Sequence, residues 1–351
     1  MNAGEMRQDL ISGRWVIYAP SRRKRPQDFQ KAHPHPRHLP LHDDLCPFCP
    51  GNEQVLSRII LELKGTSLDW QLRIIQNKYP ALTPEGDLRR TREGLFISME
   101  GYGHHEVVIE TPKHNLQIAE MSLDEVERII ESYHMRYHDL MLKEQNMSII
   151  IFRNKGRRSG ASIPHPHSQI ISTCLVPTYK REQEYRAQQY FDIWGRCVYC
   201  DILQHELQSS ARIVDQNQSF LTFVPYASEV PFEMSIMPKA HKASFAEISD
   251  QEKADLAQSL RGALQRLHEK LNAPDYNYIL HSPSRYCSGE PHVHWFLQIS
   301  PRITTRAGFE MGSGISINTN LPEDDAGFLC GEDTSLEERR DHVGARHPDR
   351  G

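Results

Sequence analysis

The chain has 351 residues, of which 38% are hydrophobic and 25% are charged, a composition typical of a globular protein and a length sufficient for two domains. The formal net charge of -5 gives no overall basic field that would favour nucleic acid as the main partner, and no apolar run approaches the roughly 20 residues that span a bilayer. Residues 1–10 lack the apolar core of a signal peptide, so we expect a cytoplasmic protein with no nucleic-acid or membrane partner.

The first elements in chain order are a short strand and a basic run. Residues 14–19 predict a strand that ends at Pro20. The basic run at residues 22–25 follows, and such a run is usually a solvated charged surface. The alternative is phosphate binding, because guanidinium groups bind phosphate in a bidentate fork.

Two Cys-x-x-Cys pairs are the most informative feature among the seven cysteines. They are Cys46–Cys49 and Cys197–Cys200, and the remaining cysteines are isolated. An odd total in a reducing compartment argues against a disulfide framework. A thioredoxin-like redox pair is an alternative, but two such pairs in a chain with 19 histidines fit zinc better.

Three strands and one helix are predicted after the first cysteine pair. Apolar runs predict the strands at residues 70–75, 103–110 and 146–152. The helix is expected to begin after Ser122, because this serine can cap it together with Glu125 three residues later.

A His-rich stretch at residues 163–170 then predicts a strand in which residues two apart share a face. His165, His167 and Gln169 would therefore point the same way. Together they supply a metal ligand, a nucleophile or general base, and a hydrogen-bond donor for phosphate oxygens. Taken alone, this pattern favours a solvated His-Pro tract like residues 32–36, and only the rest of the chain reverses that interpretation.

The order of elements repeats after residue 177, which indicates a duplicated α+β domain. We expect antiparallel sheets with packed helices in two half-domains, residues 1–178 and 179–330, and a charged, disordered tail at residues 331–351. The repeated elements are the second Cys-x-x-Cys, strands at 220–227, 234–241 and 277–281, a helix capped by Ser249 and Glu252, and a His-rich strand at 290–300.

The repeat also separates the histidines by role. When the two His-rich stretches are aligned on the glutamine near their ends, His165 falls on His294, whereas the position of His167 is occupied by Phe296. Another register would make His292 the equivalent residue. Each half then keeps a complete Cys₂His₂ set, which leaves no open coordination position and is typical of structural zinc. The two sets are Cys46, Cys49, His114 and His165, and Cys197, Cys200, His241 and His294. The alternative for His114 and His241 is a turn position without a metal.

Four motifs stand in the order of a known family: Cys-x-x-Cys, Val-Ile-x-x-Pro-x-His, Asn-Lys-Gly and His-Pro-His-x-Gln. Over roughly residues 8–325 the chain resembles galactose-1-phosphate uridylyltransferase, the duplicated branch of the histidine-triad superfamily. The resemblance implies two tandem histidine-triad-like half-domains. It also implies a ping-pong nucleotidyltransferase that acts on nucleotide sugars and hexose 1-phosphates, with UDP-glucose:hexose-1-phosphate uridylyl transfer in galactose metabolism as the expected activity.

The resemblance assigns roles to individual residues. The second histidine of the motif attacks the α-phosphorus in that family, so His167 is the expected nucleophile and Gln169 the expected amide donor to the phosphate oxygens. The expected substrate contacts are Arg22 and Arg25 for phosphate, Asn77 for base and ribose, Asn154 and Gly160 in the phosphate loop, Ser162 near the β-phosphate, and Gly308, Phe309 and Glu310 for the hexose.

The C-terminal stretch departs from the family pattern, which has a Gly-Tyr-Glu core where this chain has Gly308-Phe309-Glu310 and a Gly-rich ending. That ending and the two full zinc sets are more similar to a related branch, ADP-glucose phosphorylase, which passes AMP to phosphate. The motifs are also compatible with a histidine-triad hydrolase or with a zinc-stabilised nucleic-acid-binding module. The expected partners are a nucleotide sugar, a sugar phosphate or phosphate, and a second copy of the chain in a homodimer.

Overall fold

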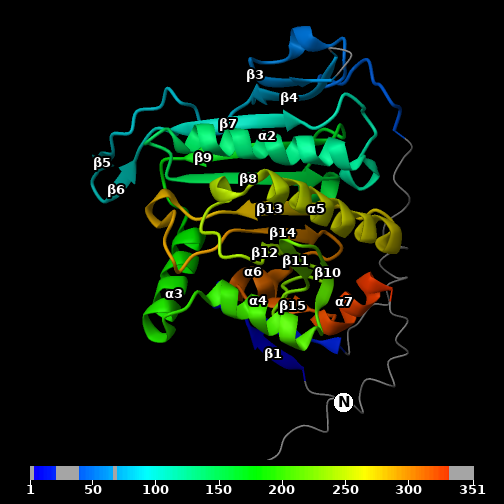
Figure 1. Cartoon of the computed structure of the whole chain (residues 1–351). Coiled ribbons are helices and arrows are strands. Elements are labelled where there is room, and N and C mark those ends of the chain that lie inside the picture. The colour runs from blue at the N-terminus through cyan, green and yellow to red at the C-terminus, as the bar shows by residue number, and fades with distance from the viewer. Residues whose placement is uncertain (1–3, 21–38, 66–68, 332–351) are drawn as a thin grey trace, which may run out of the picture.

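The computed structural model describes residues 4–20, 39–65 and 69–331 (Figure 1). Arg22, Arg25 and residues 332–351 of the expected tail lie outside the described residues. Among those described, no helix combines the length and the apolar character needed to cross a membrane.

Ten strands form one central sheet in the order β10-β11-β12-β14-β13-β8-β9-β7-β4-β3. Each strand pairs antiparallel with its neighbours, and β8 pairs with β13 at the centre. From its outer edge inward, the first half contributes β3 (Ile59–Lys64), β4 (Trp70–Gln76), β7 (Gly103–Ile109), β9 (His167–Thr173) and β8 (Ser148–Lys155). In the same inward order, the second half contributes β10 (Ile213–Gln216), β11 (Phe220–Phe223), β12 (Met234–Pro238), β14 (Phe296–Pro301) and β13 (Tyr276–His281). This shared order confirms the duplicated α+β fold predicted from the sequence.

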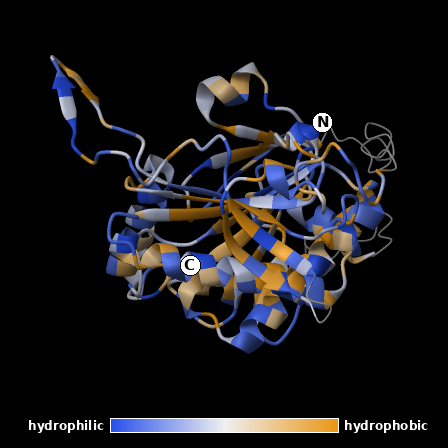
Figure 2. Cartoon of the chain, turned by 90° about the horizontal axis from the view of Figure 1, so that it is seen from above, coloured by the Kyte–Doolittle hydropathy of each residue, from blue (hydrophilic) through white to orange (hydrophobic). Residues whose placement is uncertain are grey.

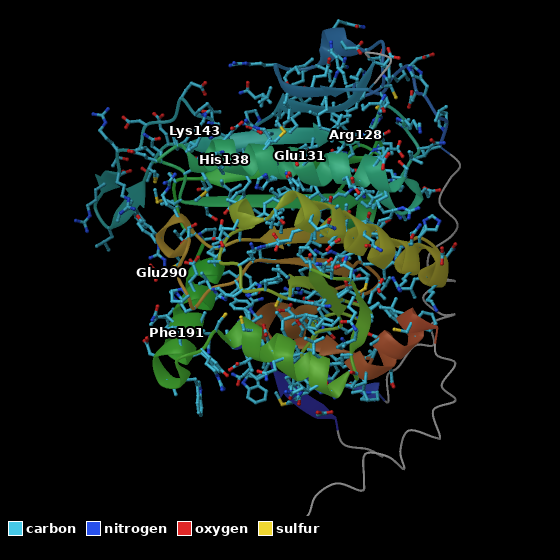
Figure 3. The ribbon with its side chains drawn as sticks, in the orientation of Figure 1. Arg128, Glu131, His138, Lys143, Phe191 and Glu290 are labelled. Carbon is cyan, nitrogen blue, oxygen red and sulfur yellow. The ribbon has the colours of Figure 1, made fainter. Side chains whose placement is uncertain are left out.

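Two long helices, α2 (Leu123–Met141) and α5 (Asp250–Leu271), lie side by side on one face of the sheet (Figure 1). Both begin as predicted, because Ser122 and Ser249 accept the backbone N–H of the glutamate three residues later. Their apolar sides pack on the strands in the largest core cluster. Figure 2 shows the hydrophobic residues gathered on the central strands, whereas Arg128, Glu131 and His138 line the outer side of α2 (Figure 3).

The opposite face of the sheet is covered differently in the two halves. In the second half, α3 (Thr178–Trp194) and α4 (Val198–Ser209) pack with β11, β12 and β14. In the first half, the loop of Cys46 and Cys49 places Phe48 against β4 and β7. The sequence did not predict α3 or α4. Only Gln183 and Ala187 of α3 are buried, so this helix has almost no apolar stripe for a pattern to detect.

The remaining elements lie at the periphery of the sheet. A hairpin, β5 (Thr91–Glu93) and β6 (Phe96–Ser98), extends away from the body (Figures 1 and 2). A three-stranded sheet joins β1 (Glu5–Gln8), β2 (Trp15–Tyr18) and β15 (Ser316–Asn318), next to the short helices α6 (Gly308–Ser313) and α7 (Pro322–Cys330). The predicted strand at residues 163–170 begins only at His167.

A buried ion pair lies where the two halves meet. Arg153 of β8 donates from Nε to both carboxylate oxygens of Glu110 at 3.0 Å, and the two side chains are 1% and 0% exposed. The same guanidinium donates to the hydroxyl of Tyr276 on β13 at 2.8 Å. A buried charge destabilises the fold unless a counter-charge and hydrogen bonds compensate it. This cluster therefore stabilises the contact between the halves only when all of its side chains are present.

We predict that Arg153→Met destabilises the protein by about 3–5 kcal/mol, because Glu110 is left buried without a counter-charge. Urea unfolding followed by circular dichroism measures the loss. The double variant Arg153→Met/Glu110→Leu removes both charges and should recover most of it. A single variant as stable as the parent would contradict this assignment.

Candidate active site and metal clusters

Four candidate ligands from separate segments converge in the first half, on the sheet face opposite α2. Cys49 Sγ lies 3.5 Å from His114 Nδ1 and 3.6 Å from His165 Nδ1, and Cys46 Sγ lies 3.7 Å from His165 Nδ1. All four donor atoms lie within 4.8 Å of one another. A tetrahedral zinc ion would separate its sulfur and nitrogen ligands by about 3.6 Å, given the usual bond lengths. The donor set and its spacing therefore fit zinc.

The second half repeats this arrangement with Cys197 and Cys200 at the start of α4. Cys200 Sγ lies 3.4 Å from His241 Nδ1 and 3.8 Å from His294 Nδ1. His292 contributes no ligand atom to this cluster of described residues, and its backbone carbonyl oxygen lies 3.7 Å from Cys197 Sγ. The geometry thus places His294 at the position equivalent to His165.

Hydrogen bonds outside each cluster set the tautomer of these two histidines. The Nε2 atom of His165 lies 2.8 Å from the Thr111 carbonyl, and that of His294 lies 3.1 Å from the Pro238 carbonyl. Since a carbonyl only accepts, each Nε2 carries the hydrogen and Nδ1 is left to face the sulfurs. Burial lowers the pKa of His165 to about 4, which keeps the ring neutral, as metal binding requires.

His167 opens β9 directly after the first cluster. Its Nδ1 donates to the His165 carbonyl at 2.8 Å, so the Nε2 lone pair is available. Burial lowers the pKa of the His167 imidazole, and the Arg153 guanidinium lowers it further, against the opposing effect of that hydrogen bond. The ring of Phe48 packs edge-on against His167, with centroids 5.5 Å apart. His167 is therefore a fixed, neutral imidazole, the form that can attack phosphorus.

Strand alternation places Gln169 on the same face as His167, as the sequence predicted, and Ser168 on the other. Ser168 faces α2 and accepts from the hydroxyl of Tyr133 at 2.6 Å. The Oε1 atom of Gln169 lies 2.7 Å from Nε2 of His105 on the neighbouring strand β7. Nδ2 of Asn77, the predicted base and ribose contact, lies 3.0 Å from the same His105 nitrogen.

The predicted phosphate loop follows β8. The register of β8 against β9 pairs Phe152 with Gln169, so two further residues bring Asn154 level with His167. Asn277 of β13 donates to Oδ1 of Asn154 at 2.6 Å. The loop turns at Gly156 and Gly160, with φ of +86° and +93°. The positive φ favours glycine at position 156, and a Cβ there would lie 1.8 Å from a carboxylate oxygen of Asp275, so a larger residue would also displace that side chain. Gly160 and Ser162 are exposed on this loop.

The predicted hexose contacts lie elsewhere in the chain. Gly308, Phe309 and Glu310 belong to α6, beside the second half and away from β9 (Figure 1). The Glu310 carboxylate accepts the backbone N–H groups of Ala307 and Ile317 at 2.9 and 3.1 Å. Within one chain, the structure does not bring α6 together with His167.

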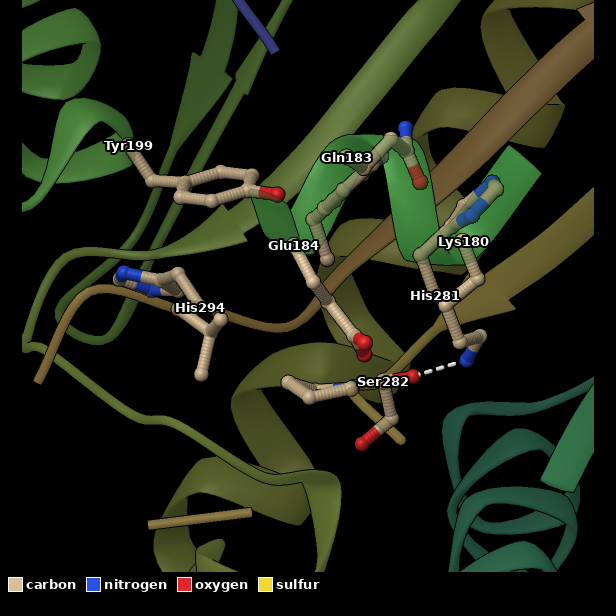
Figure 4. A pocket seen from close by; sticks show the side chains of 10 residues that line it. Lys180, Gln183, Glu184, Tyr199, His281, Ser282 and His294 are labelled. Carbon is tan, nitrogen blue, oxygen red and sulfur yellow. Dashed lines mark hydrogen bonds between the residues drawn. The ribbon is translucent and has the colours of Figure 1, made fainter. Parts of the chain in front are cut away.

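A small pocket in the second half occupies the place that corresponds to the candidate nucleophile of the first (Figure 4). Phe296 lines it at the nucleophile position, and the ring of His281 stacks on Phe296 with centroids 4.6 Å apart. Lys180 donates to the Ser282 carbonyl, and Glu184 accepts from a backbone N–H and a serine hydroxyl after β13. These charged groups therefore already have protein partners.

Comparison with known proteins agrees with this geometry. The galactose-1-phosphate uridyl transferase N-terminal domain matches residues 2–177, and the C-terminal domain of the same name matches residues 178–303. An ADP-glucose phosphorylase of Arabidopsis thaliana is 35% identical over 325 residues, which cover 91% of this chain and 90% of that protein. A galactose-1-phosphate uridylyltransferase of Thermotoga maritima is 27% identical over 332 residues, which cover 92% of this chain and 96% of that protein.

The solved structures show the same two relationships. The crystal structure of an ADP-glucose phosphorylase from Arabidopsis thaliana with bound ADP-glucose has a TM-score of 0.80 and 31% identity, and the match covers 95% of this chain and 100% of that one. A uridylyltransferase structure has a TM-score of 0.72 and 26% identity, with 94% and 98% covered.

We predict that the purified chain holds two zinc ions, one in each cluster. His294→Asn should reduce the content to one ion per chain, because it removes a ligand atom from the second cluster. His292→Asn is the matched control two residues away and should keep both ions. Elemental analysis after gel filtration measures the ratio. Loss of zinc from His292→Asn but not from His294→Asn would overturn the ligand assignment.

Proposed function

Since this chain belongs to the galactose-1-phosphate uridyl transferase family, we propose that it transfers a nucleotidyl group from a nucleotide sugar through a covalent intermediate on His167. The observation that carries this proposal is the state of His167, a buried neutral imidazole whose Nδ1 is bound to the His165 carbonyl. We assign the chemistry to residues 1–178 and the support of the site to residues 179–330.

In the first step, Nε2 of His167 attacks the α-phosphorus of the nucleotide sugar. The bond to the bridging oxygen breaks, and the sugar 1-phosphate leaves with the electron pair. In the second step, a phosphate oxygen of the acceptor attacks the same phosphorus, and the P–N bond returns its electron pair to the ring. Gln169 and the loop after Asn154 stabilise the negative charge that builds up on the phosphoryl oxygens in both steps.

Zinc has a supporting role in this proposal. An ion bound by Cys46, Cys49, His114 and His165 supplies structural cross-linking between the loop of Phe48 and the start of β9. The protein groups alone carry the transfer, because the closed Cys₂His₂ set has no position for a substrate.

Two candidates remain for the base and the acceptor. The activity that names the family is uridylyl exchange between UDP-glucose and a hexose 1-phosphate. Adenylyl transfer from ADP-glucose to phosphate is the second candidate. The relative at 35% identity favours it, as does the departure of Gly308-Phe309-Glu310 from the hexose-recognising pattern. Both candidates use the same first step on His167.

The homodimer is also part of this proposal. Because α6 lies away from β9, the strand that begins at His167, in its own chain, hexose contacts from Gly308, Phe309 and Glu310 would require α6 of a second copy. Gel filtration with light scattering tests the oligomeric state directly. Mixed dimers that pair His167→Gly with Glu310→Ala should recover part of the activity lost by either variant alone, and a monomeric active enzyme would reject the arrangement.

We predict that His167 becomes labelled when the enzyme is mixed with a nucleotide sugar carrying a radioactive α-phosphate. Digestion and peptide mapping locate the label. His167→Phe copies the second half, where Phe296 holds this position, so it should fold with its zinc content unchanged and take no label. His167→Gly should behave in the same way, and added imidazole should restore part of the transfer by filling the space. Label on another residue during active exchange would reject the mechanism.

We predict that an acceptor is needed for more than one turnover. Parallel assays of UDP-glucose and ADP-glucose against phosphate, glucose 1-phosphate and galactose 1-phosphate identify the donor and the acceptor. Without acceptor, the enzyme should release about one sugar 1-phosphate per active site, because the nucleotide stays on His167. Continuous release in the absence of acceptor would show a nucleotide hydrolase instead.

A further inference from the structure

We infer that His105 is a positioning residue that turns the amide of Gln169 so that its NH₂ group faces the phosphate. This inference rests on the proposed function, because it concerns the group that stabilises the transferred phosphoryl. His105 lies on β7, is not one of the candidate metal ligands, and was not predicted from the sequence.

The hydrogen bonds of His105 fix its tautomer. Its Nδ1 accepts the backbone N–H of Ala81 at 3.1 Å. Since a backbone N–H can only donate, the hydrogen of the neutral ring is on Nε2. That Nε2–H donates to Oε1 of Gln169 at 2.7 Å. The amide nitrogen of Asn77 lies 3.0 Å from the same Nε2 and makes no hydrogen bond with it in this tautomer, because both groups are donors. The oxygen end of the Gln169 amide is therefore held against β7, and the NH₂ end is left for another partner.

The second half has a glutamine at the equivalent position, Gln298, but different groups bind its amide. The registers pair Val107 with Gln169 and Ser235 with Gln298, so the residues two positions earlier, His105 and Glu233, are equivalent. Nε2 of Gln298 donates to the Glu233 carboxylate. Its Oε1 lies 3.0 Å from Nε2 of His281. Both ends of the Gln298 amide are thus bound inside the protein.

In the first half, among the described residues, only the oxygen end of the Gln169 amide has a side-chain hydrogen-bond partner. The half with a histidine at the nucleophile position thus has a histidine that donates to the glutamine. The half with Phe296 at that position has a carboxylate that accepts from it. A donor at position 105 leaves the NH₂ group to the substrate, whereas an acceptor there would attract it away from the substrate.

This difference allows a test in which substitutions at position 105 should lower the labelling rate constant by different amounts. His105→Glu reproduces the second half and should rotate the Gln169 amide, so that its oxygen faces the phosphate oxygens. His105→Phe removes the donor without adding an acceptor, and His105→Gln keeps a donor at this position. The rate constant for labelling His167 should fall most in His105→Glu and least in His105→Gln. For His105→Glu we expect a fall of roughly 100-fold, the lower end of the usual effect of losing one such donor.

The same variants in a Gln169→Ala background show whether His105 acts through Gln169. Gln169→Ala alone should lower the labelling rate constant by roughly 100-fold or more, and His105→Phe should then add less than about twofold, because the group it orients is gone. If His105 had only a structural role, the two reductions of the labelling rate constant would multiply in the double variant. Gln298→Ala, the equivalent change in the second half, is the control and should leave the rate constant unchanged.

The outcomes separate this inference from the proposed function. Suppose that His167 is labelled and that Gln169→Ala lowers the labelling rate constant. If His105→Glu is then labelled as fast as His105→Gln, or if the losses multiply in the double variant, the positioning role is wrong and the proposed function stands. If His167 is labelled neither in the parent nor in any variant, the proposed function itself fails. Zinc content and urea unfolding of each variant establish that the compared proteins are folded.

Discussion

The pairing of β8 with β13 is the interaction on which the rest of the structure depends. Without it, each half would end in an exposed edge strand, and the core under α2 and α5 would be split. The pairing also contributes to the candidate active site, since Asn154 at the end of β8 accepts a hydrogen bond from Asn277 of β13. The buried cluster of Arg153, Glu110 and Tyr276 is a second connection between the two halves. The second half therefore supports the candidate site, whose candidate nucleophile belongs to the first half.

The two halves keep the same framework and differ in their chemistry. Both retain a Cys₂His₂ cluster and a glutamine on the strand that follows it. In the second half, Phe296 stands at the position of the candidate nucleophile, and the ring of His281 stacks on it. A cluster that fixes the chain at the start of a strand is needed wherever the fold is needed, whereas a nucleophile is needed once. This is why the repeat could separate the candidate ligand His165 from the candidate nucleophile His167.

The sequence predicted the parts of this structure that have a local signal. Serine caps with a glutamate three residues later located α2 and α5, and Cys-x-x-Cys with ordered histidines located both clusters. It missed α3, because that helix buries little apolar surface, and it also missed α4. It also missed His105. Residues 104 and 105 are both histidines, and only the register of β7 against β9 decides which one reaches Gln169. His104 points to the other face, where it contacts Ser172.

A two-step transfer places a particular demand on this site. In the proposed mechanism, the nucleotide stays on the protein while one sugar phosphate leaves and another acceptor enters, so the candidate nucleophile has to keep its position without help from a bound sugar. His167 is held from three directions that do not involve the substrate: the His165 carbonyl, the ring of Phe48, and the strand β9 itself. Behind that strand, the hydroxyl of Tyr133 connects Ser168 with Tyr278 of the second half, each at 2.6 Å. The buried hydroxyls thus extend the contact between the two halves to the residue next to the candidate nucleophile.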